Sequence, residues 1–159
     1  HVRSRRQRQM CIRDRSNAKS VAILNGGTAK PITYGLTADG FTSDKTQATV
    51  ADKRLTLIQD LSRPGKITET YGFKAVASTD AASADMILKG LSQSGAESQF
   101  FVRRAVDNAT VHTVGQIGDL VTGIVGVRRP NAPVENGVDT AEYALFVTKP
   151  TESDVVLVA

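Results

Sequence analysis

The stretch that most constrains the fold is residues 54–76, RLTLIQDLSRPGKITETYGFKAV, in which apolar and polar side chains alternate on either side of a Pro-Gly pair. Successive side chains of a β-strand point to opposite faces, so this alternation predicts two strands, each with one apolar and one polar face. We expect a hairpin that turns at Pro64-Gly65-Lys66, because a three-residue loop keeps the two faces apart. The residues of the apolar face are Leu55, Leu57, Leu61, Tyr71, Phe73 and Ala75.

The rest of the chain is predicted to be mainly antiparallel β-sheet with hairpins, an α+β protein. Six further segments have strand patterns or end at hairpin turn signals: residues 18–24, 31–36, 98–106, 110–114, 120–129 and 138–148. Residues 38–51 are rich in Thr, Ser, Asp, Lys and Gly, which favours a loop with one edge strand at most. A short helix is expected at 80–91, where apolar residues recur at helical spacing, and a helix start at 150–154.

The first fifteen residues differ from the remainder in charge. They hold six arginines and one acidic residue, and without them the net charge falls from +4 to −1. One interpretation is a disordered basic arm that neutralises phosphates. The other is a non-native tail, because QMCIRDR resembles translated sequencing-adapter bases, so that the native chain begins near Ser16. We favour the second interpretation, and divide the chain into a tail at 1–15 and one domain at 16–159.

Catalytic chemistry has few candidate residues in this chain. Beyond residue 15, His112 is the only histidine and cysteine is absent, so Ser–His and Cys–His catalysis and His/Cys metal sites lack parts. The glycines fit no phosphate-binding motif, and no run of about 18 apolar residues indicates a membrane span. We therefore expect a protein that is not an enzyme, with no metal or cofactor, and interpret His112 as a surface or packing residue.

Three blocks of sequence resemble the coat proteins of single-stranded RNA bacteriophages, the levivirus group. Residues 20–40, SVAILNGGTAKPITYGLTADG, resemble the first hairpin of that family, and residues 54–76 resemble its central hairpin. Residues 136–159 resemble its last strand and the start of the helix beyond it. The blocks occur in the family's order, and the resemblance implies a chain truncated before the two C-terminal helices.

The resemblance implies a capsid subunit that forms a homodimer and then a shell around single-stranded genomic RNA. Its location would be the virion, with assembly in the host bacterial cytoplasm and no membrane partner. The RNA would lie on the polar face of the sheet, where basic groups hold phosphates and threonines contact bases. The residues expected on that face are Arg54, Thr56, Thr70, Lys74 and Arg128.

Two other functions fit the same residues. A tail-tube or head-associated structural protein of a tailed phage is also rich in Thr, Ser and Val, self-associates and lacks catalytic residues. The near-neutral body of this chain favours that alternative, because shells around nucleic acid usually have a basic inner face. A small-molecule binding β-barrel is the third possibility, and it predicts a monomer with an enclosed pocket.

Overall fold

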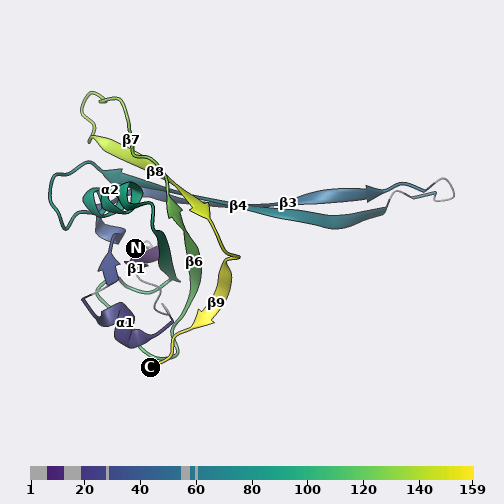
Figure 1. Ribbon diagram of the computed structural model, residues 1–159, viewed down its shortest axis with the longest axis horizontal. Coiled ribbons are helices and arrows are strands. Elements are labelled where there is room, and N and C mark those ends of the chain that lie inside the picture. The colour runs from purple at the N-terminus through teal and green to yellow at the C-terminus, as the bar shows by residue number, and fades with distance from the viewer. Residues whose placement is uncertain (1–6, 13–18, 28, 55–57, 60) are drawn as a thin grey trace, which may run out of the picture.

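The computed structural model describes residues 7–12, 19–27, 29–54, 58–59 and 61–159. In this part of the chain, strands dominate and helices are short (Figure 1). The elements in chain order are β1 (Gln7–Ile12), α1 (Val21–Asn25), β2 (Ala29–Pro31), the 3-10 helix η1 (Thr33–Gly35), β3 (Leu36–Asp52), β4 (Leu61–Val76), α2 (Ala84–Ser94), β5 (Glu97–Arg104), β6 (Ile117–Val125), β7 (Arg129–Pro130), β8 (Thr140–Val147) and β9 (Glu152–Val156).

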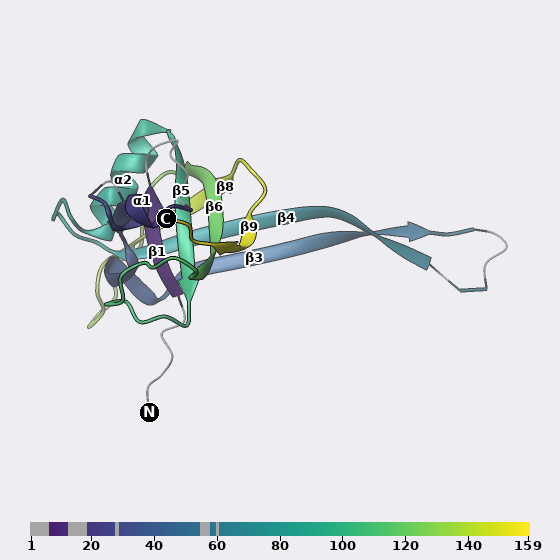
Figure 2. The same ribbon diagram turned by 90° about the horizontal axis from the view of Figure 1, so that it is seen from below.

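The strands of the described residues form one nine-stranded sheet. Its main path runs β2-β1-β5-β6-β8-β4-β3, while β7 pairs with β8 and β9 pairs with β6. All the paired strands run antiparallel, and the sheet curls into a half-barrel from which β3 and β4 project (Figures 1 and 2). The expected α+β class with a mainly antiparallel sheet is confirmed.

Two hydrophobic clusters fill the body, and β5 and β6 contribute to both. Phe100 of β5 and its register partner Val121 of β6 belong to the cluster beneath α2, whereas the next pair, Phe101 and Leu120, belongs to the cluster beneath α1. Because neighbouring residues of a strand point to opposite faces, β5 and β6 are covered on both faces. This explains their nearly continuous burial.

Helix α2 confirms the predicted helix but begins later than residue 80. The Ser83 side chain accepts a hydrogen bond from the backbone N–H of Met86 and so caps the first turn. Asp80 instead accepts from the N–H of Ala82 in the preceding turn. Gly95, with φ of 62°, ends the helix in the left-handed conformation.

Several other predictions were wrong. The expected strand at 18–24 is helix α1, because burial of Leu24 in the cluster beneath it outweighs the local strand pattern. The return strand expected at 31–36 is mostly η1, and no strand forms at 110–114. The helix start expected at 150–154 is strand β9, which pairs with β6 and buries Val155.

The strands expected at 98–106, 120–129 and 138–148 correspond to β5, β6 and β8, with ends that differ by up to four residues. Residues 7–12, which the sequence places in a tail, form β1 between β2 and β5. The division of the chain at residue 15 stays a prediction.

Candidate functional site: the projecting ribbon

The most unusual feature of the molecule is a long two-stranded ribbon that leaves the body. Strand β4 pairs with β8 only over Tyr71–Val76, while its pairing with β3 continues outward to Leu61. We call the projecting part, residues 42–52 of β3 and 61–70 of β4, the ribbon (Figures 1 and 2). The end of the ribbon next to the body, around Lys45 and Glu69, is called its root. Beyond the root, and within the described residues, each strand of the ribbon pairs only with the other. Nearly all of its side chains are exposed on both faces.

The ribbon corrects the predicted hairpin. Residues 38–51 are part of a 17-residue strand instead of a loop, and Pro64-Gly65 lies inside β4 instead of at a turn. The register shifts between Gln47 and Thr49, so that Gly65 and Lys66 face the single residue Ala48 in a β-bulge. A Cβ on Gly65 would lie 2.8 Å from the Ala48 carbonyl oxygen, which explains the glycine at this position.

A polar cluster anchors the root of the ribbon to the body. The Nζ of Lys45 lies 2.6 Å from Glu69 Oε1, and the hydroxyl of Thr151 donates to Glu69 Oε2. The Tyr71 hydroxyl donates to Thr151 Oγ1 at 3.4 Å. Burial alone would raise the pKa of the Glu69 carboxyl, but the hydrogen bonds from Lys45 and Thr151 hold that pKa below its ordinary value. The root therefore has a fixed direction relative to the sheet.

The outer half of the ribbon, residues 46–52 and 61–68, combines charge with exposed apolar side chains. The Asp52 carboxylate bonds both Arg54, at 3.1 Å, and Arg63, at 3.3 Å. Three large apolar side chains of this half remain about half exposed. They are Val50 at 55%, Leu61 at 47% and Ile67 at 49% exposure.

The structure brings together only two of the five residues predicted to bind RNA. Thr70 and Lys74 lie on β4 with the parity opposite to the buried Phe73, so they share the polar face of the sheet. Thr70 lines a hollow of about 230 Å³ there, and Lys74 lines a neighbouring hollow of about 210 Å³. The ammonium of Lys74 lies 3.7 Å from the Asp39 carboxylate.

The other three predicted residues lie elsewhere. Arg54 is at the far end of the ribbon, where it bonds Asp52, and Thr56 lies outside the described residues. Arg128 lies on the opposite side of the sheet from Lys74, where its guanidinium forms two hydrogen bonds of 3.1 and 3.0 Å to the carboxylate of Asp85 in α2.

Asp85 is the centre of a hydrogen-bond network that joins α2 to the sheet. Besides Arg128, it accepts hydrogen bonds from the Tyr143 hydroxyl at 2.6 Å and from the backbone N–H of Ser78 at 3.2 Å. Burial favours a raised pKa, but these donors outweigh it and lower the pKa of Asp85. The pKa of Tyr143 is raised by burial and by the same carboxylate. Arg128 is therefore a structural residue.

Sequence reasoning allowed one edge strand within residues 38–51 but missed that strand β3 runs through all of them and forms half of the ribbon. The available signal was its content of β-branched residues, Thr42, Thr46, Thr49 and Val50, together with the absence of proline between Leu36 and Asp52. Its many polar residues indicated a loop because, beyond Phe41, neither face of this strand is buried in its own chain.

Among the described residues, no group of three or more His, Cys, Asp or Glu side chains is placed to hold a metal ion. In the same part of the chain, no helix has the length and apolar character needed to cross a membrane. His112 is buried and packs edge-on against Phe101, as a packing residue.

Comparison with protein families gives one match over nearly the whole chain. The model of a family described as phage tail tube protein matches residues 12–159. No curated protein matches the chain. The resemblance to RNA-phage coat proteins is therefore wrong, and with it the capsid subunit and its homodimer. The match supports no RNA binding, and the five residues above stay untested as RNA contacts. The alternative of a tail-tube protein is the one that the match supports.

Proposed function

The chain belongs to the phage tail tube protein family, and we propose that its copies polymerise into the tube with the ribbon as the arm that joins one copy to the next. Membership of this family makes the protein a structural component of the phage virion, in the tail, and not an enzyme. We place its assembly in the cytoplasm of the host.

The observation that carries the proposal is the isolation of the ribbon. A two-stranded hairpin alone in water is at best marginally stable, and three strands or a packed face are normally needed. Here, within the described residues, nothing else packs against the outer half of the ribbon. Covering the exposed halves of Val50, Leu61 and Ile67 would contribute about 1 kcal/mol each, taking roughly half of the value for full burial. Another copy of the chain supplies that cover.

Shortening the ribbon tests this role. Lys45 and Glu69 are register partners, so an Asn-Gly turn that replaces residues 46–68 closes a short hairpin without changing the root. The Lys45–Glu69–Thr151 cluster remains intact in this variant. We expect a folded body with the far-UV circular dichroism of a β-protein, and no tubes by negative-stain electron microscopy.

The parent chain, purified in the same way, is the reference for assembly. It should sediment as large particles at concentrations where the shortened variant sediments as a monomer. Tubes of normal diameter from the shortened variant would contradict the proposed role of the ribbon.

A further inference from the structure

We infer that the ribbon joins a second copy of this chain through one edge, the outer edge of β3 at residues 46–51, which adds as a strand to the sheet of that copy. The inference rests on the proposed function and deepens it by naming the part of the arm that binds. An exposed strand edge presents unpaired N–H and C=O groups that can pair with another chain. The ribbon has two such edges, and they differ in chemistry.

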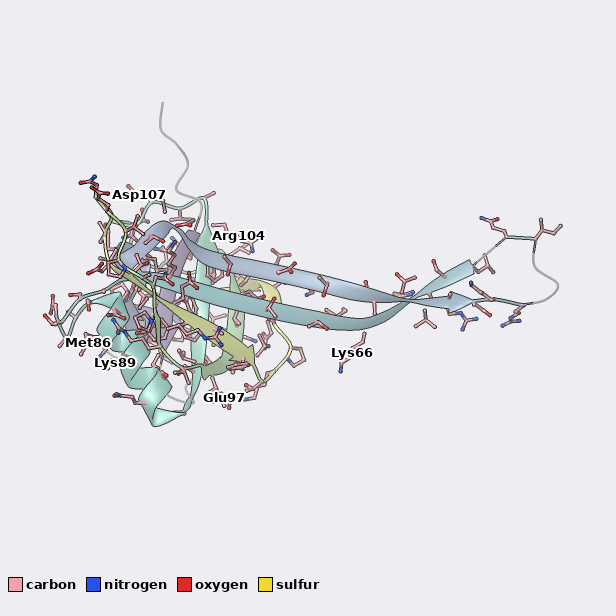
Figure 3. All side chains as sticks on the ribbon, turned by 90° about the horizontal axis from the view of Figure 1, so that it is seen from above. Lys66, Met86, Lys89, Glu97, Arg104 and Asp107 are labelled. Carbon is pink, nitrogen blue, oxygen red and sulfur yellow. The ribbon has the colours of Figure 1, made fainter. Side chains whose placement is uncertain are left out.

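The outer edge of β4 has features that oppose strand addition. Pro64 has no N–H to donate, and the bulge at Gly65 and Lys66 interrupts the regular ladder. Lys66 is exposed and points away from the ribbon, and Arg63 lies three residues before it (Figure 3). Proline, bulges and lysine are the devices by which natural sheets protect their edges.

The outer edge of β3 lacks these features over six residues. Residues 46–51, TQATVA, contain no charge, no proline and no glycine, and Thr and Val favour extended strands. Every side chain in this stretch is exposed, and among the described residues β3 is the last strand on its side of the sheet. Such an edge is a predicted aggregation site unless a partner covers it. The opposite edge strand of the sheet, β2, is only three residues long and ends at Pro31.

The occupant that fits the open edge is a second copy of the chain, because the chain belongs to the phage tail tube protein family. A protein that polymerises head to tail needs an open edge that binds a different surface of the next copy, while the other edge of the same arm is protected from random pairing. The charged residues on either side of the open stretch, Lys45 and Asp52, limit the length over which a strand can be added. Open and protected edges on the same ribbon therefore fit directed self-assembly.

Residue-resolved amide hydrogen exchange tests the inference directly. In an antiparallel pair, about every second N–H faces the partner strand and the others face outward. In the dilute monomer, the outward amides of residues 46–51 should exchange quickly. In the assembled state their exchange should slow by at least about tenfold, because each gains a hydrogen bond. The outward amides of 61–68 should not change comparably.

A pair of substitutions provides a matched control. Thr46 and Thr68 are register partners, so their side chains lie side by side on the same face of the ribbon. Docking through that face would make Thr46→Lys and Thr68→Lys equally harmful. Docking through the β3 edge predicts that Thr46→Lys raises the concentration needed for assembly by about tenfold, and Thr68→Lys by less than about twofold.

The outcomes separate the two proposals. If the shortened ribbon abolishes assembly while the outward β3 amides exchange equally fast in monomer and tube, the arm is correct and the edge is wrong. Equal effects of the two lysine substitutions would also overturn the edge. If the full chain remains a monomer at every concentration, both proposals are wrong.

Discussion

Lowering the pH from 7 to 5 should destabilise the fold by about 2 kcal/mol through a single side chain, His112. This imidazole is only 3% exposed. The Asn25 amide donates to the His112 carbonyl oxygen at 2.8 Å and accepts from its backbone N–H at 3.1 Å, which fixes the amide orientation. Nδ1 lies 3.3 Å from the same Asn25 Oδ1, so Nδ1 carries the hydrogen. A proton added at Nε2 finds no acceptor among the described residues.

The magnitude follows from the pKa shift. Burial, and then the nearby Arg103 charge, lower the pKa of His112 from 6.5 to about 4. Because the folded-state pKa lies below the unfolded value, the unfolded chain takes up the proton first as the pH falls. The contribution of neutral His112 to the free energy of unfolding is therefore fully present above pH 6.5 and is lost as the pH falls to about 4. Linkage gives a loss of about 2 kcal/mol between pH 7 and pH 5, and about 3 kcal/mol at lower pH.

Urea unfolding at pH 7, 6 and 5, followed by circular dichroism on the dilute monomer, measures this loss. The lowered pKa values of Glu69 and Asp85 place their titration below this window. His112→Gln is the control, because its stability should change by less than about 0.5 kcal/mol over the same range. A parent chain that is equally stable at pH 7 and pH 5 would refute the assignment of His112 as a buried neutral group.

Three further predictions concern the body. Arg128→Ala should lower the free energy of unfolding by about 2–3 kcal/mol, because it leaves the Asp85 carboxylate without its cation. This loss is somewhat below the range for breaking a fully buried ion pair. In urea titrations, Arg128→Lys should recover part of the loss. Gly90→Ala should raise that free energy by about 1 kcal/mol, since nothing outside the helix lies within 4 Å of the new Cβ. Gly118→Ala should lower the free energy of unfolding by about 1–3 kcal/mol, because the new Cβ would lie 2.5 Å from the Phe101 ring. If thermal unfolding finds Gly118→Ala more stable than Gly90→Ala, the packing described here is wrong.

The sequence predicted best the elements that are completed within the chain. Tyr71 and Phe73 alternate with polar residues because one side of β4 packs against the cluster beneath α2, and period-2 alternation records such half-burial. Leu88 and Leu91 recur at helical spacing for the same reason. Helix α1 was missed because five residues are too few to show a helical period, and its Leu24 is held by tertiary contacts.

Turn chemistry misled the prediction at Pro64-Gly65. These residues favour turns because proline fixes φ and glycine allows another backbone segment to approach closely. A β-bulge favours the same two residue types. Pairing of Thr49 with Pro64 shows that the strand continues through them. Only the long-range register between β3 and β4 distinguishes the two cases, and that information does not lie in the dipeptide.

A further error, the loop expected over most of residues 38–51, has a physical cause that bears on function. Binary patterning marks a strand when one of its faces is buried within the same chain. Strand β3 has no such face beyond Phe41, so its sequence was free to be polar throughout, and only β-branched Thr and Val remain as evidence of extended structure. A strand completed by a second molecule needs an open edge more than an apolar face. Residues 46–51 are uncharged and free of proline and glycine, as such an edge requires. The segment that we propose for assembly therefore lies in a stretch whose sequence pattern, taken for a single chain, predicts a loop.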